Sequence, residues 1–135
     1  MRKLRVLLAD DHRPFLNMVE SLLKPTCEVV GSVSDGQSLF DAARHLEPDV
    51  IVTDISMPIL SGIEAGKQLG ESGCAARIIF LTVHSDSDFV QACLATGARG
   101  YVLKPRIMSD LLFAIQEALA GRIFISPPLT AQATP

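Results

Sequence analysis

The chain has 135 residues, of which 48% are hydrophobic, and its formal net charge is −3. This length fits one domain with a short remainder, and no apolar run approaches the ~20 residues that a membrane-spanning helix needs. Because no Lys/Arg run gives the basic surface of a nucleic-acid binder, we predict a soluble protein that does not itself bind DNA.

The first half of the chain alternates short apolar runs with amphipathic segments. LRVLLA (4–9) predicts a buried strand, and residues 11–24 predict a helix with Asp11 as its N-cap and Pro25 beyond its end. CEVVGSV (27–33) predicts a second strand, and residues 35–47 predict a helix that Pro48 terminates. DVIVT (49–53) predicts the third strand.

The second half repeats this alternation. After a loop punctuated by Pro58 and Gly62, the predicted elements are a helix (63–71), a strand (77–82), a helix (87–98), a strand (100–104) and a helix (108–120). Ser109 or Asp110 is expected to cap the last helix, and Gly121 is placed to end it. Residues 1–121 then form the domain, and residues 122–135 are expected to be a linker or C-terminal tail.

The order of these elements predicts the fold class. Strands alternating with helices of ~10 to 14 residues form right-handed βαβ crossovers, which place the strands in one parallel sheet with helices on both faces. The chain is therefore predicted to be an α/β protein of (βα)₅ type, with a doubly wound, five-stranded parallel sheet.

Polar residues follow four of the predicted strands. They are Asp10 and Asp11, Asp54, Thr82 and Lys104. The carboxyl ends of parallel strands meet at one edge of the sheet, so these side chains are expected to converge. Three carboxylates repel one another, each pair by roughly 4 kcal/mol at about 4 Å and an effective dielectric near 20, which implies a bound cation and a nearby lysine. The arrangement points to phosphoryl chemistry on an aspartate.

The motifs of this edge, in this order, resemble the receiver domain of bacterial two-component response regulators over roughly residues 3–121. The segments LLADDH, GARGYVLK and GRIFISPPL resemble the NarL/FixJ (LuxR-type) family, whose members usually continue into a helix-turn-helix domain. The resemblance implies a flavodoxin-like fold with strand order 2-1-3-4-5 and a receiver domain over residues 1–121. It also implies a phosphoacceptor that is not an enzyme, apart from self-catalysed gain and loss of phosphate.

The resemblance assigns the carboxylates to phosphate acceptance and metal binding. Asp54 is the phosphoacceptor, which forms an acyl phosphate. Asp11 and Asp54 directly, Asp10 through water, and the backbone carbonyl of Ser56 are expected to hold Mg²⁺ or Mn²⁺, since such cations prefer oxygen ligands. On its own, Asp11 would fit a helix N-cap better, and it is the company of Asp54 and Lys104 that favours metal binding.

The resemblance also assigns stabilising and switching roles. Lys104 and Thr82 stabilise the phosphoryl group, and the Lys104–Pro105 bond is expected to be cis. The added charge draws the Thr82 hydroxyl toward the phosphoryl group, and Tyr101 then turns inward. The face over residues 87–120 would change with them, and it is our candidate homodimer interface. Apart from the resemblance, Thr82 would also fit an ordinary residue at a strand end, and Tyr101 would fit an aromatic side chain packed on its neighbours.

The expected partner is a sensor histidine kinase in the cytoplasm, and DNA would be contacted only through a C-terminal domain absent from this chain. The unpaired cysteines, which match no zinc or CxxC spacing, favour a reducing compartment.

His84 and Ser56 are placed to tune the acyl-phosphate lifetime. Val83 is bulkier than the small residue that usually follows the threonine in this family. Two alternatives remain open, a stand-alone receiver that signals by protein contact, and a Mg²⁺-dependent aspartyl phosphatase, whose DxD motif here reads ADDHRP.

Overall fold

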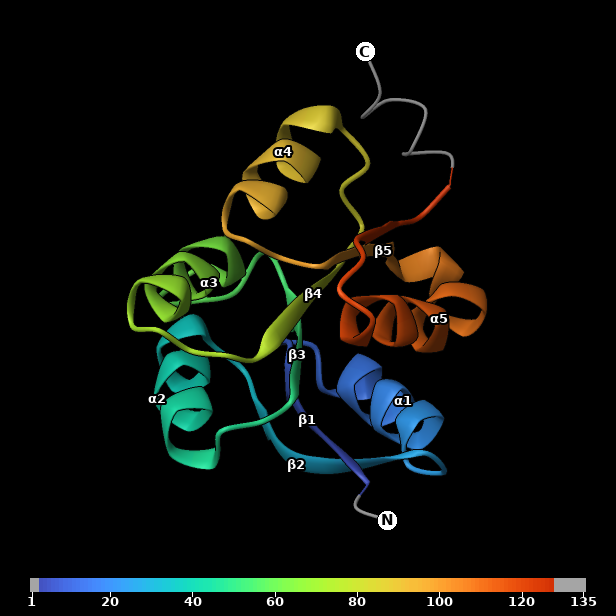
Figure 1. The fold of residues 1–135 in the computed structure, drawn as a ribbon, viewed down its shortest axis with the longest axis horizontal. Coiled ribbons are helices and arrows are strands. Elements are labelled where there is room, and N and C mark those ends of the chain that lie inside the picture. Colours follow the sequence, from blue (N-terminus) through green and yellow to red (C-terminus); the bar gives the residue numbers. More distant parts are fainter. Residues whose placement is uncertain (1–2, 128–135) are drawn as a thin grey trace.

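The structure, a computed structural model, describes residues 3–127, which form a parallel sheet between two groups of helices (Figure 1). The sheet has six strands in the order β2-β1-β3-β4-β5-β6. The strands are β1 (Leu4–Ala9), β2 (Cys27–Val33), β3 (Val50–Asp54), β4 (Arg77–Thr82), β5 (Gly100–Leu103) and β6 (Phe124–Ile125). The helices are α1 (Arg13–Leu23), α2 (Gly36–Leu46), α3 (Gly62–Glu71), α4 (Ser87–Ala95) and α5 (Ile107–Leu119), with a 3₁₀ turn (Lys104–Arg106) before α5.

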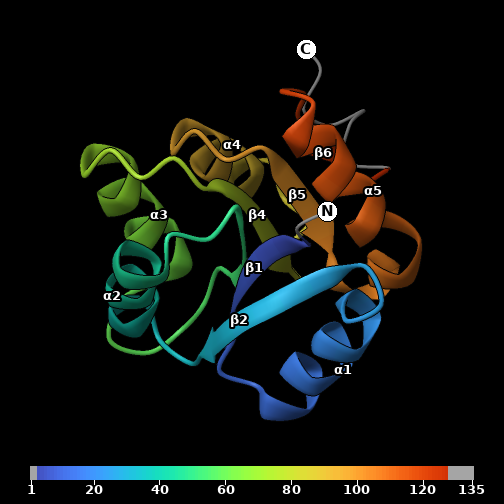
Figure 2. The same ribbon diagram turned by 60° about the horizontal axis from the view of Figure 1, so that its bottom comes forward.

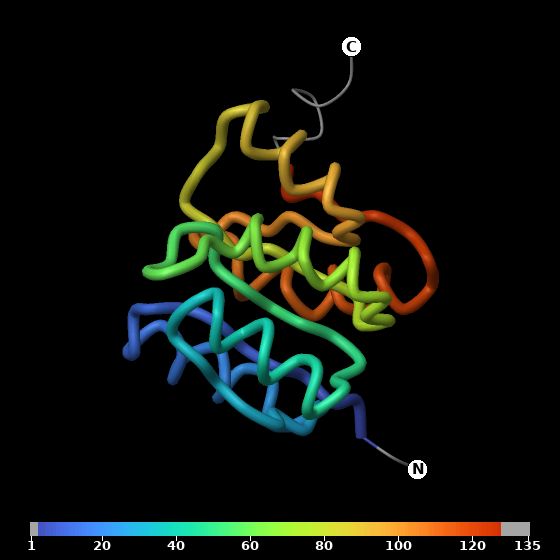
Figure 3. The backbone as a smooth tube through the Cα atoms, turned by 90° about the vertical axis from the view of Figure 1, so that its left-hand side faces the viewer, coloured from blue at the N-terminus to red at the C-terminus, as the bar shows by residue number. Residues whose placement is uncertain are grey.

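The helices divide between the two faces of the sheet, so the protein has two hydrophobic cores. Helices α1 and α5 pack on one face around Leu16 and Leu111, whereas α2, α3 and α4 pack on the other around Leu39 and Phe80 (Figure 2). Figure 3 views the second face, on which α2, α3 and α4 lie side by side. Strands β1, β3 and β4 are covered on both sides, which is why their sequences are nearly continuous apolar runs.

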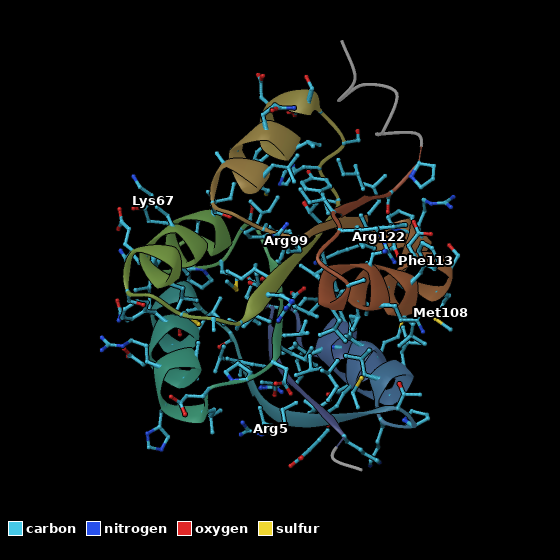
Figure 4. All side chains as sticks on the ribbon, in the orientation of Figure 1. Arg5, Lys67, Arg99, Met108, Phe113 and Arg122 are labelled. Carbon is cyan, nitrogen blue, oxygen red and sulfur yellow. The ribbon has the colours of Figure 1, made fainter. Side chains whose placement is uncertain are left out.

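The predicted α/β fold and the strand order 2-1-3-4-5 are confirmed, but the prediction of five strands was one short. Strand β6 pairs in parallel with β5 and lies within the segment predicted as linker. Just after it, the fully buried Ser126 donates to Asp110 (2.7 Å) and accepts from the backbone N–H of Leu103 (3.1 Å). On its outer side, Phe124 meets Phe113 of α5 edge to face at 5.5 Å, and Figure 4 shows Phe113 near Arg122 at this side of the molecule.

Two predicted helix caps were wrong. Helix α1 has His12 rather than Asp11 at its N-cap, without a side-chain cap, and the backbone N–H of His12 donates to Asp10 Oδ1 at 2.9 Å. Helix α5 follows directly from the 3₁₀ turn with Arg106 at its N-cap. Asp110 is turned instead toward Ser126 and the Arg106 guanidinium, and it leaves the helix end uncapped.

Other boundaries shift by a few residues. Helix α4 ends at Ala95, before Gly97 at φ 91°, so the predicted end at residue 98 was too late. Gly121, at φ 83°, follows the end of α5 as predicted. Among residues 3–127, no helix is both long and apolar enough to cross a bilayer. Residues 128–135 of the predicted tail lie outside the described residues.

Candidate functional site

Three carboxylates converge at the carboxyl edge of the sheet, as the sequence predicted. Strands β1 and β3 are neighbours in parallel register, so the residues that follow them meet. One carboxylate oxygen each of Asp10, Asp11 and Asp54 lies within 4.8 Å of the others. Asp10 and Asp54 are buried, at 3% and 9% exposure, whereas Asp11 is exposed. The cluster is thus anchored in the sheet and open on the side of Asp11.

Lys104 reaches this cluster from the end of β5. Its Nζ donates to Asp10 Oδ2 at 2.8 Å and to Asp54 Oδ2 at 3.2 Å. Three carboxylates and one ammonium leave a formal charge of −2 among the four side chains. Clustered carboxylate oxygens that carry this charge suit a hard divalent cation such as Mg²⁺, which takes oxygen ligands.

The second oxygens of the two buried carboxylates are held by the backbone. Asp10 Oδ1 accepts from the N–H of His12 at 2.9 Å, and Asp54 Oδ1 accepts from the N–H of Ile55 at 2.7 Å. These bonds fix the orientation of both side chains, with Oδ2 of each turned toward Lys104. A site built on strand ends with locked side chains is suited to positioning a reacting group.

The titration behaviour of the site reflects its burial and its crowded charges. Burial raises the pKa of Asp54, Lys104 opposes that shift, and Asp10 adds to it. For Lys104, burial lowers the pKa, but hydrogen bonds and attraction from Asp10 and Asp54 outweigh this and raise it. The lysine therefore stays charged, whereas ionisation of the Asp54 carboxyl is less favourable in this site than in water.

The loop after β3 is held against the site by a glycine. The N–H of Gly62 donates to the carbonyl of Ile55 at 2.7 Å, and a Cβ at Gly62 would overlap the carbonyl oxygen of Asp54. This close approach is open only to glycine. It positions the loop that carries Ser56, whose exposed hydroxyl lies 3.3 Å from Nε2 of His84.

His84 joins the predicted switch residues. Thr82 is fully buried, and its Oγ1 accepts from the N–H of His84 at 3.0 Å. The Tyr101 hydroxyl donates to the carbonyl of His84 at 2.7 Å, and the His84 ring stacks on Phe89 with centroids 4.1 Å apart. Burial raises the pKa of Tyr101, and the Thr82 hydroxyl opposes that shift. Tyr101 is fully buried, with its ring turned into the core.

One residue beside the site was not predicted from the sequence. The ring of Phe15, in the first turn of α1, lies under Lys104, with Nζ 4.4 Å from the ring centroid. In the sequence, Phe15 is one of several apolar residues at helical spacing. Nothing in that spacing distinguishes a core residue from one that contacts the site, because Lys104 is 89 residues further along the chain.

Comparison with known proteins agrees with this geometry. A family model described as the response regulator receiver domain matches residues 6–116. The chain belongs to this family. It is 36% identical over 127 residues to the nitrate/nitrite response regulator protein NarL of Escherichia coli (strain K12), which covers 93% of this chain and 59% of NarL. It is 34% identical over 129 residues to YvfU of Bacillus subtilis (strain 168), an uncharacterized transcriptional regulatory protein, which covers 94% of this chain and 64% of YvfU.

Solved receiver structures share the fold closely. A LuxR-family two-component response regulator from Aurantimonas sp. SI85-9A1 matches with a TM-score of 0.91 and 32% identity, over 97% of this chain and 95% of that one. The isolated REC domain of RcsB from Salmonella enterica serovar Typhimurium, solved in the presence of the phosphomimetic BeF₃⁻, matches with a TM-score of 0.87 and 27% identity, over 96% and 98%.

These relatives define the type of receiver. This chain is a response-regulator receiver domain of the NarL/LuxR type. It spans 55 to 64% of the length of YvfU, NarL and DegU of Brevibacillus brevis. The family does not favour the aspartyl phosphatase that the sequence left open.

Proposed function

We propose that this domain accepts a phosphoryl group on Asp54 from the phosphohistidine of a sensor histidine kinase. The observation that carries the proposal is the Lys104 ammonium shared between Asp10 and Asp54, within a carboxylate cluster that keeps a charge of −2. A purely structural ion pair would need one carboxylate. Three carboxylates at one edge, at the cost of their mutual repulsion, suit a centre that binds a divalent cation and a phosphoryl group.

The chain's own residues would position and stabilise the transfer. The Asp54 carboxylate, held by the N–H of Ile55, attacks phosphorus in line with the imidazole nitrogen. The O–P bond forms as the P–N bond breaks, and the imidazole leaves with the electron pair. Lys104 moves from the Asp54 oxygen to a phosphoryl oxygen and offsets its charge. Asp11, Asp54 and the Ser56 carbonyl, with Asp10 through water, would hold a Mg²⁺ ion, which would add charge stabilisation at the phosphoryl oxygens.

The signal would leave the site through Thr82. Its buried hydroxyl is bonded to His84, and His84 is bonded to Tyr101, so a phosphoryl group that attracts Thr82 acts on β4, on β5 and on the loop between β4 and α4. We propose that the face over residues 87–120 then forms a homodimer. The relatives are named as transcriptional regulators, so we propose that a DNA-binding domain outside this chain carries the output.

Phosphorylation with a small donor tests the central claim. Incubation with Mg²⁺ and acetyl phosphate should add the mass of one phosphate, as measured by intact-protein mass spectrometry. The addition should be lost in Asp54→Asn and kept in Asp41→Asn, a control that removes an exposed carboxylate on α2. No mass increase with any phosphodonor, or an equal increase in Asp54→Asn, would refute the proposal.

A further inference from the structure

Lys104 has a third neighbour besides its two carboxylates. The ring of Phe15 lies 4.4 Å from Nζ, well within the ~6 Å at which an aromatic face attracts a cation. Phe15 is partly buried and packs against the core between the sheet, α1 and α5. The Lys104 side chain is 16% exposed, so little water competes for its ammonium. Both conditions strengthen the attraction between the ring and the cation.

The carboxylate contacts of Lys104 cannot all persist during phosphoryl transfer. Asp54 becomes an acyl phosphate, and Asp10, together with Asp11 and Asp54, would help to hold the cation. The contact with Phe15 competes with neither event, because an aromatic face binds no phosphate and no Mg²⁺. Of the three contacts described for Nζ, it is the one whose partner takes no part in metal binding or phosphoryl transfer.

We propose that Phe15 is a positioning residue for phosphoryl transfer. Its π face holds the Lys104 ammonium at the carboxyl edge of the sheet while the carboxylate partners of Lys104 are taken up by metal and phosphate. This inference rests on the proposed function of Asp54. It assigns to the first turn of α1 a part in the chemistry, in addition to its packing in the core.

The rate of phosphate acceptance tests the π contact apart from packing. Phe15→Leu should slow phosphorylation by acetyl phosphate about 5- to 10-fold, whereas Phe15→Tyr, which keeps an aromatic face, should retain most of the wild-type rate. Replacement of Phe15 with mono-, di- and trifluorinated phenylalanine should slow the reaction stepwise, since each fluorine weakens the negative ring face at nearly constant shape. The same series at Phe40, whose ring lies 5.5 Å from the guanidinium of Arg44 away from the site, should leave the rate unchanged.

An NMR measurement decides the contact independently of activity. The ε-methylene protons of Lys104 should be shifted upfield by the Phe15 ring, and the shift should vanish in Phe15→Leu. If the wild type is phosphorylated on Asp54 but the fluorinated series is flat, or if the Lys104 protons show no ring shift, the inference is wrong and the proposed function stands. A wild-type chain that takes no phosphate overturns the proposed function and the kinetic role of Phe15, even where the ring shift is present.

Discussion

Replacing Asp54 with asparagine should stabilise the protein in the absence of divalent cations. Attraction between Asp54 and Lys104 at 3.2 Å is about 5 kcal/mol at an effective dielectric near 20, and repulsion from Asp10, within 4.8 Å, is at least about 3.5 kcal/mol. These two nearly offset each other. Desolvation of the buried carboxylate, which costs several kcal/mol, then decides the sign, in agreement with the raised pKa of Asp54. We expect Asp54→Asn to gain about 1–2 kcal/mol, because the amide keeps an acceptor for Ile55 N–H.

Urea denaturation in EDTA at neutral pH measures this gain, with Asp41→Asn as the control for a change in net charge. Because the folded-state pKa of Asp54 is raised above its usual 3.8, the penalty is complete above the folded pKa, shrinks as the pH falls through it and is gone below 3.8. The gain should therefore shrink in acid. Millimolar Mg²⁺ should stabilise the wild type and leave Asp54→Asn largely unaffected. A variant less stable than the wild type in EDTA would show that the site does not disfavour the Asp54 charge.

Three further substitutions test how the site is held. Ser126→Ala should cost about 2–3 kcal/mol in urea denaturation, because it removes a buried bond to Asp110; a loss below about 0.5 kcal/mol would mean that the segment with β6 is a loose tail. Tyr101→Phe should cost about 1 kcal/mol and leave phosphorylation by acetyl phosphate intact; loss of phosphorylation would instead place the hydroxyl in the chemistry. Gly62→Ala should lower the free energy of unfolding by about 2–3 kcal/mol and slow phosphorylation by acetyl phosphate, because its Cβ would overlap the carbonyl of Asp54. Gly70→Ala is the control, since its Cβ would meet no atom closer than 3.6 Å, and it should be neutral or stabilising. Equal effects of the two substitutions would refute the packing argument.

The strands were predicted well because a strand covered on both faces leaves a strong local signal. LRVLLA, CEVVGSV and RIIFLT coincide with β1, β2 and β4 residue for residue. Strand β6 has only two residues and stands before a proline, so it leaves no periodic pattern. Its place in the sheet depends on a hydrogen bond from the backbone of Ser126 to β5 and on the buried Ser126 side chain, both long-range contacts.

The two wrong caps show what residue type and position leave out. Asp11 and Asp110 have the residue type and position of N-caps, and in isolation each is a good candidate. In the folded protein helix α1 begins at Arg13, so Asp11 lies one residue before the N-cap, and Asp110 is bonded to Arg106 and Ser126. Tertiary partners with charge or burial outweigh a local cap of about 1 kcal/mol, and such partners are not encoded in spacing.

The same limit separates the predicted from the unpredicted part of the site. Topology alone brings Asp10, Asp54 and Lys104 together, since parallel strands end at one edge and order fixes their neighbours. Phe15 was not predicted, and for His84 the sequence indicated a place beside the site but not its bonds; the two residues stand on a helix and a loop above that edge. Their contacts with Lys104 and Tyr101 arise from side-chain direction, which the alternation of strands and helices does not specify.

The position of His84 explains how a small movement at Thr82 could reach two strands. The Thr82 oxygen accepts from the His84 N–H, and the His84 carbonyl accepts from the Tyr101 hydroxyl. On the proposed function, a phosphoryl group on Asp54 draws the Thr82 hydroxyl away and leaves the His84 N–H without its acceptor. The His84 backbone must then shift to find a new partner, and its carbonyl shifts with it. Because Tyr101 is fully buried in the core with Val90 and Cys93 of α4, this shift would be passed to β5 and α4.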